Sequence, residues 1–101
     1  MKHYRISLSE TAKLEYDNYI DFIKVKYAAP LTAARHFKGI DDTINSLKTN
    51  AEMYFIQTHP SFLRYGLNVR RINYKKIAII YTVQDNIVLI HRIMAASLIT
   101  I

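Results

Sequence analysis

Six cationic side chains dominate the second half of this chain of 101 residues, and together they could neutralise an anionic partner. No acidic residue lies between Glu52 and Asp85. Residues 53–101 carry six Lys/Arg against one Asp/Glu, a net charge of +5, whereas residues 1–52 carry eight against seven, a net charge of +1. A positive field in one half favours a polyanionic or acidic partner, with a merely solvated basic face as the alternative. The predicted nucleic-acid-binding or target-binding residues are Arg64, Arg70, Arg71, Lys75, Lys76 and Arg92.

Three side chains of this basic half could take part in cleaving a phosphodiester bond. His59 is the candidate general base, because histidine titrates near neutral pH, although a His-Pro turn explains it as well and is the favoured interpretation. Arg71 and Arg92 could balance the charge that gathers on phosphorus. Arg71 is equally well explained as a solvated arginine at a strand edge. Lys75 and Lys76 fall in a turn, where solvated lysines are ordinary. The catalytic residues are thus unknown, with Arg71, Arg92 and His59 as candidates.

The composition argues against several kinds of site. The chain has no cysteine, which excludes a disulfide framework and thiolate catalysis. Its four histidines are scattered, and no HExxH, Walker loop, GxGxxG or GxSxG motif is present, so we expect no metal and no cofactor. No apolar run approaches the roughly 20 residues that span a bilayer, and the N-terminus has no apolar signal region. We therefore expect one cytoplasmic domain over residues 1–101, with no membrane partner.

Hydrophobic periodicity predicts an α+β fold in the order β-α-α-β-β-β. The alternation from His3 to Leu8 is typical of a half-buried strand, and Ser9 follows as a helix N-cap. Apolar residues then recur at steps of three and four along two helices, the second starting at Pro30. Because the break between them is short, we expect an antiparallel helical hairpin packed on a curved, mostly antiparallel sheet. The later strands are expected at Leu67–Asn73, Ile77–Val83 and Ile87–Met94.

The strand expected at Ile77–Val83 is apolar on both faces, which predicts a central position in the sheet. Tyr81 within it is interpreted as a core residue whose hydroxyl finds a partner at the sheet edge, with a catalytic phenol as the weaker alternative. On the last strand, Arg92 is the residue we favour for function. His91 is interpreted as a packed, hydrogen-bonded histidine.

The start of the β region is harder to interpret. Val69 and Ile72 differ in parity, which predicts a change of face or a bulge near Arg70 and Arg71. Arg70 is expected to meet an acid on the helical hairpin. Residues 51–66 stay unassigned, because their apolar residues fit either a short strand or a loop tucked into the core.

Three stretches in this order resemble a known family. The first is Ser9-Glu10-Thr11-Ala12, directly after the first strand; the second is Val69–Tyr81; the third is Ile87–Ile93. They are similar to the helix opening, the central strand pair and the closing strand of the RelE/ParE toxin superfamily. The likeness covers nearly the whole chain. It implies the toxin of a type II toxin–antitoxin module, held inactive by an antitoxin with an acidic or amphipathic segment.

Members of that superfamily arrest growth in two ways: RelE-type toxins cut mRNA in the ribosomal A site, and ParE-type toxins inhibit DNA gyrase. The resemblance implies that the nuclease branch would place a basic residue where this chain has Arg71. It would also place an arginine where this chain has Ala78, and basic, Tyr or His groups after the last strand. Here the tail Ala95–Ile101 has no ionisable side chain. Ala and Leu can neither move a proton nor balance a phosphate charge, so most of the nuclease set is missing.

We therefore favour a plasmid-stabilisation (addiction) toxin that inhibits a protein target such as gyrase and is not an enzyme. The first alternative is a ribosome-dependent mRNA endoribonuclease, and the second is a degenerate, non-toxic antitoxin-binding module. We expect the cations to project together from a concave sheet beneath the helical cover. The uncharged tail needs cover from its own sheet or from a partner, so the antitoxin or a second copy of the chain is expected there, as a homodimer or a heterotetramer with antitoxin.

Overall fold

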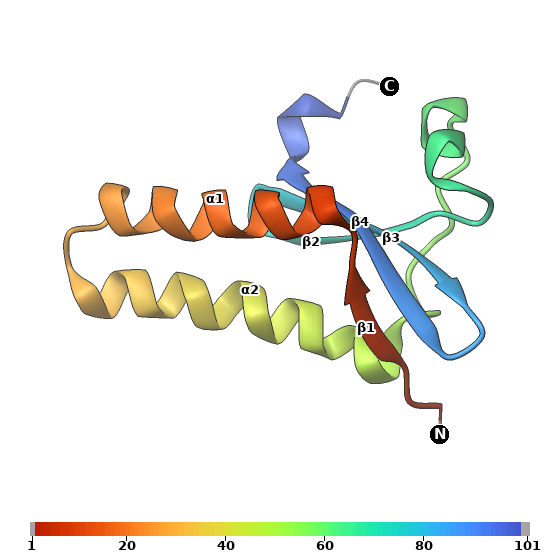
Figure 1. The fold of residues 1–101 in the computed structure, drawn as a ribbon, viewed down its shortest axis with the longest axis horizontal. Coiled ribbons are helices and arrows are strands. Elements are labelled where there is room, and N and C mark those ends of the chain that lie inside the picture. The colour runs from red at the N-terminus through yellow and green to blue at the C-terminus, as the bar shows by residue number, and fades with distance from the viewer. Residues whose placement is uncertain (1, 100–101) are drawn as a thin grey trace.

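The computed structural model describes residues 2–99 and has the predicted order β-α-α-β-β-β, with an antiparallel helical hairpin packed on one face of a four-stranded sheet (Figure 1). Two short 3-10 helices, η1 and η2, were not predicted. The elements are β1 (Arg5–Leu8), α1 (Glu10–Lys26), α2 (Pro30–Asn50), η1 (Pro60–Tyr65), β2 (Arg70–Tyr74), β3 (Ile77–Gln84), β4 (Ile87–Ala95) and η2 (Ala96–Leu98). Within residues 2–99, no helix combines the length and apolar character that a membrane crossing requires.

The start of α1 is fixed by Ser9, which confirms its predicted capping role. Its side-chain oxygen accepts a hydrogen bond from the backbone N–H of Ala12 at 3.0 Å and donates one to the carbonyl of His91 at 2.9 Å. One hydroxyl therefore both caps the helix and ties it to β4. Helix α2 begins at Pro30, as predicted, since proline costs little in the first turn.

The strand order is β1-β4-β3-β2, with β1 parallel to β4 and the other neighbours antiparallel. The central, doubly covered position predicted for β3 is confirmed: Ile79 and Tyr81 pack with the helices, while Ile80 packs on the other face with Phe62 and Val69. Tyr81 is a core residue, and its hydroxyl donates to the carbonyl of Ala51 at 2.7 Å.

The bulge expected near Arg70 and Arg71 is absent there, because β2 pairs with β3 in unbroken register. Val69 and Ile72 face opposite sides of the sheet, and each finds its own apolar cluster, so their parity needs no change of face. The register shift lies instead between β3 and β4, where Ile80 pairs with Arg92 and Tyr81 with Ile90. The residue left over at this bulge is His91.

The segment 51–66 forms neither a full strand nor a plain loop. Ile56 makes an isolated bridge to Arg70, and η1 then places the buried ring of Phe62 on the open face of the sheet. Strand β2 begins at Arg70 rather than at Leu67, because Asn68 has a positive φ of 56° and interrupts the extended backbone.

Candidate functional site

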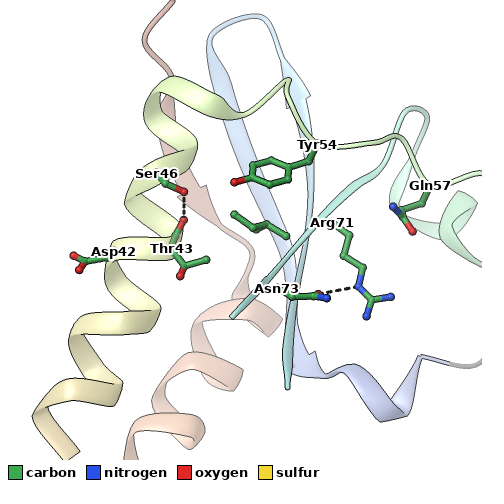
Figure 2. A pocket seen from close by; sticks show the side chains of 8 residues that line it. Asp42, Thr43, Ser46, Tyr54, Gln57, Arg71 and Asn73 are labelled. Carbon is green, nitrogen blue, oxygen red and sulfur yellow. Dashed lines mark hydrogen bonds between the residues drawn. The ribbon is translucent and has the colours of Figure 1, made fainter. Parts of the chain in front are cut away.

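Arg71 lies beside an open groove of about 730 Å³ between α2 and β2, the edge strand of the sheet (Figure 2). Its Nε donates to the side-chain oxygen of Asn73 at 3.0 Å, which fixes the direction of the guanidinium. Within residues 2–99, Arg71 forms no ion pair, and its terminal nitrogens donate no hydrogen bond to another residue. The groove is lined by Asp42, Thr43, Ser46, Tyr54, Gln57, Arg71, Ile72 and Asn73.

Three other polar side chains of this groove are already engaged. Asp42 is paired with Lys38 at 2.8 Å, and the hydroxyls of Thr43 and Ser46 donate to carbonyls of their own helix at 2.8 and 2.6 Å. Arg71 therefore carries the uncompensated charge of the groove. A guanidinium with free terminal nitrogens binds a carboxylate or phosphate in two-pronged geometry, which suits it to recognising an anionic group on a partner.

Arg92, in contrast, is bound by Glu15 of α1. The Glu15 carboxylate accepts hydrogen bonds from Arg92 Nε at 3.0 and 3.1 Å and from Nη2 at 2.9 Å, and it raises the pKa of Arg92 further above its ordinary value. It also accepts the backbone N–H of Ile93 at 3.0 Å. The pairing of β1 with β4 ends at Ile90, so the backbone N–H of Ile93 has no partner in β1. The Glu15 carboxylate supplies the hydrogen-bond acceptor there instead. The ion pair with Glu15 thus favours a structural role for Arg92 over a role as an unpaired cation that binds a partner.

Arg71 and Arg92 lie on the same face of the sheet, because both pair with Ile80. That face carries η1 and lies opposite the helices, so the expectation of cations projecting beneath the helical cover is wrong. The two arginines also do not share a cradle. Arg92 lines a small hollow of about 80 Å³ together with Arg64 and Tyr65, separate from the groove beside Arg71.

The remaining cations lie apart from Arg71 as well. Arg70 donates to the carbonyls of Glu52 and Tyr54 at 3.0 and 2.5 Å. The expected acidic partner on the helical hairpin is thus replaced by backbone carbonyls of two residues that follow the end of α2. Arg64 donates from Nε to the carbonyl of Ser61 at 3.0 Å. Lys75 and Lys76 form the turn between β2 and β3, as predicted.

His59 is the N-cap of η1, which agrees with the turn interpretation. Its Nδ1 accepts the backbone N–H of Ser61 at 3.1 Å and lies 2.9 Å from the Ser61 hydroxyl, so this ring nitrogen is occupied. His91 is packed and hydrogen-bonded, as interpreted: its Nε2 lies 2.8 Å from the Thr82 hydroxyl, and burial lowers its pKa.

Two residues around Arg92 were missed by the sequence analysis. Glu15 falls three residues after Ala12 and four before Tyr19, on the apolar stripe of α1, and an acid on such a stripe indicates a hidden partner. The Tyr65 hydroxyl accepts a hydrogen bond from Arg92 Nη1 at 3.4 Å. The ring centroid of Tyr65 is 5.5 Å from the ring centroid of His91. No sequence pattern indicated this second contact.

The geometry is that of a small basic βααβββ protein in which Arg71, free of ion pairs among residues 2–99, lines an open groove, an arrangement suited to binding a macromolecular partner. Residues 6–97 match the model of the family described as ParE toxin of the type II toxin–antitoxin system, parDE, and the chain belongs to that family. The fold is similar to a solved structure of the chromosomal ParDE TA system from P. aeruginosa, with a TM-score of 0.68 and 16% sequence identity over 92% of this chain and 96% of that one. A comparison with curated proteins gave no match.

Proposed function

We propose that the chain is a toxin that arrests growth by binding and inhibiting a protein target such as DNA gyrase, and that a cognate antitoxin with an acidic or amphipathic segment holds it inactive. Membership of the ParE toxin family supports the role as a toxin and the existence of a cognate antitoxin. The observation that carries the choice of a protein target is the dispersal of the three catalytic candidates: Arg71 faces an open groove, Arg92 is bound by Glu15, and His59 caps η1.

Metal-free RNA cleavage needs a base, an acid and fixed cations within hydrogen-bond reach of one phosphate. Among residues 2–99, no hydrogen bond joins His59 to Arg71 or Arg92. Ala78, which stands where the nuclease branch would place an arginine, is fully buried. Residues 95–99 add no ionisable group. Residues 2–99 therefore lack an assembled set for proton transfer, while Arg71 is well placed to bind a partner.

One observation keeps the endoribonuclease in view as the alternative. Arg71 and Arg92 lie on one face of the sheet, two strands apart, a separation of roughly 10 Å between their backbones. A strand of mRNA could bring two such cations to successive phosphates, with the ribosome supplying the remaining groups. The degenerate, non-toxic module is the second alternative.

The antitoxin is proposed to cover the open face around η1 and the tail. Ile99 packs on the Phe62–Ile80 cluster, but Leu63, Leu67 and Leu98 are exposed nearby, and such apolar surface favours burial against a partner. The proposed assembly is a homodimer of the toxin or a heterotetramer of toxin and antitoxin chains.

Induction of the toxin in growing cells separates these functions. Growth arrest with a DNA-damage response and intact mRNA is the expected result. In-frame cuts at mRNA 5′ ends support the endoribonuclease instead, and normal growth supports the degenerate module. Arg71→Ala should relieve the arrest, whereas Lys48→Ala, which removes an exposed charge from the end of α2, should not. If Arg71→Ala stays fully toxic, the groove is not the target-binding site.

A further inference from the structure

A second hollow, here called the hairpin pocket, lies between the helical hairpin and the β2–β3 turn, and nothing in the toxin function uses it. It has a volume of about 360 Å³ and no acidic residue in its lining, which includes four rings (Tyr19, Phe22, Tyr27 and His36) and three cations (Lys26, Lys75 and Lys76). This volume falls in the range of small-molecule sites, about 300–1,000 Å³.

The aromatic wall of the hairpin pocket is already ordered for stacking. The rings of Tyr27 and His36 are stacked, with centroids 4.5 Å apart and planes 16° from parallel. Burial, with the nearby charges of Lys75 and Lys26, lowers the pKa of His36, which favours the neutral ring. His36 Nδ1 is buried and has no hydrogen-bond partner among the described residues. An unpaired buried nitrogen is costly, so His36 is a polar group of this wall that the described residues leave unsatisfied.

The cations form the rim of the same pocket. Lys26 Nζ lies 5.5 Å from the ring centroid of Phe22 and 5.4 Å from that of Tyr27, so this ammonium is held beside the aromatic wall. Lys75 and Lys76 approach from the β2–β3 turn. Within residues 2–99, none of the three forms an ion pair. Three uncompensated ammonium groups around one opening concentrate positive potential there and favour a phosphate.

We propose that the hairpin pocket binds a nucleoside 5′-phosphate, with the base on the aromatic wall and the phosphate at the lysine rim. Planar rings favour a base because every base offers a π-face, and stacking of this kind tolerates any base sequence. A lipid tail would have to pass the charged rim. The same chemistry is offered by a free mononucleotide and by the 5′-phosphorylated end of a single strand.

Titration of the purified full chain tests the proposal, with AMP, adenosine, inorganic phosphate and a 5′-phosphorylated single-stranded tetranucleotide as probes. Binding is followed by amide chemical shifts and by calorimetry. AMP should move the resonances of the pocket residues saturably and bind at least about tenfold more tightly than adenosine or phosphate alone, since each supplies only half of the contacts. Tighter binding of the tetranucleotide than of AMP identifies a strand end as the occupant, and equal binding identifies the free nucleotide.

Variants sharpen this test. Lys26→Gln and Lys75→Gln should each weaken AMP several-fold, and together by about tenfold or more. Lys24→Gln is the matched control, because it removes the same charge from the same helix without lining the pocket, and it should leave AMP binding unchanged. His36→Leu, checked for folding by circular dichroism, should weaken AMP but not phosphate.

The proposal is overturned if AMP gives no saturable shift, if phosphate binds as tightly as AMP, or if Lys24→Gln weakens binding as much as Lys26→Gln. It is also overturned if a poly-glutamate peptide binds this pocket and AMP cannot displace it. These measurements use neither antitoxin nor gyrase, so they succeed or fail independently of the toxin function.

Discussion

The contact between Glu15 and Arg92 makes the sharpest prediction about stability. One carboxylate there accepts both the Arg92 guanidinium and the backbone N–H of Ile93, and it joins α1 to the part of β4 that β1 leaves unpaired. Glu15→Ala removes the acceptor for both donors at once. Glu15→Gln keeps an oxygen for the N–H of Ile93 but removes the charge that binds Arg92.

The expected magnitude follows from burial. Breaking a fully buried ion pair costs about 3–5 kcal/mol. The side chains of Arg92 and Glu15 are 30% and 20% exposed, so water compensates part of this and about 2 kcal/mol remains. The unpaired N–H of Ile93 adds about 1 kcal/mol. Glu15→Ala should therefore cost about 3 kcal/mol, a fall in Tm of about 12–24 °C for a domain of this size, and Glu15→Gln about 2 kcal/mol.

Urea and thermal unfolding of the wild type and both variants, followed by circular dichroism, measures these differences. Asp21→Asn is the control, because Asp21 is an exposed acid on the same helix with no ion pair within residues 2–99, and its replacement should change stability by less than about 0.5 kcal/mol. If Glu15→Ala costs no more than Asp21→Asn, the carboxylate does not hold α1 to β4 and the structural role given to Arg92 is wrong.

Three further predictions concern other parts of the molecule. Gly39→Ala should destabilise the fold by about 1–2 kcal/mol despite the better helix propensity of alanine, because a β-carbon there overlaps the Tyr74 ring. In a Tyr74→Ala background the same change should stabilise the fold, and unfolding in urea shows whether the sign of the stability change reverses. Burial lowers the pKa of His91 below 6.5, so the unfolded state binds a proton first and the free energy of unfolding should fall as the pH drops from 7 to 5. His91→Gln should make the Tm depend less on pH over this range. An unchanged slope of Tm against pH would show that another group causes the fall. Deletion of residues 96–101 should weaken the antitoxin complex by removing apolar surface near η1, and an unchanged Kd in calorimetry would mean that the antitoxin binds elsewhere.

Local patterns predicted most of the fold. The helical hairpin follows from apolar steps of three and four, from Ser9 as a cap and from Pro30 as a start, all of which act within a few residues. The hairpin turns at Lys75-Lys76 and Asp85-Asn86 follow from short breaks between apolar runs. These features need no knowledge of distant contacts.

The candidate site depends on contacts that such patterns do not encode. Glu15 and Arg92 are 77 residues apart in sequence, and their pairing follows from where β1 stops along β4. The bulge at His91 arises from the register between β3 and β4, whereas the parity of Val69 and Ile72 predicted a bulge near Arg70 and Arg71. Positive charge in the second half of the chain was evident from composition, but its division among separate hollows was not, because it depends on which face of the sheet each strand presents.

Purified components test most directly whether this toxin acts by inhibiting a protein and not by cutting RNA. DNA supercoiling by gyrase and translation of a defined mRNA by purified ribosomes are followed over one range of toxin concentrations, with wild type and Arg71→Ala compared. Loss of supercoiling at concentrations that leave the mRNA intact, and its recovery with Arg71→Ala, is the predicted result. Cleavage of the mRNA in the A site while gyrase stays fully active would contradict it.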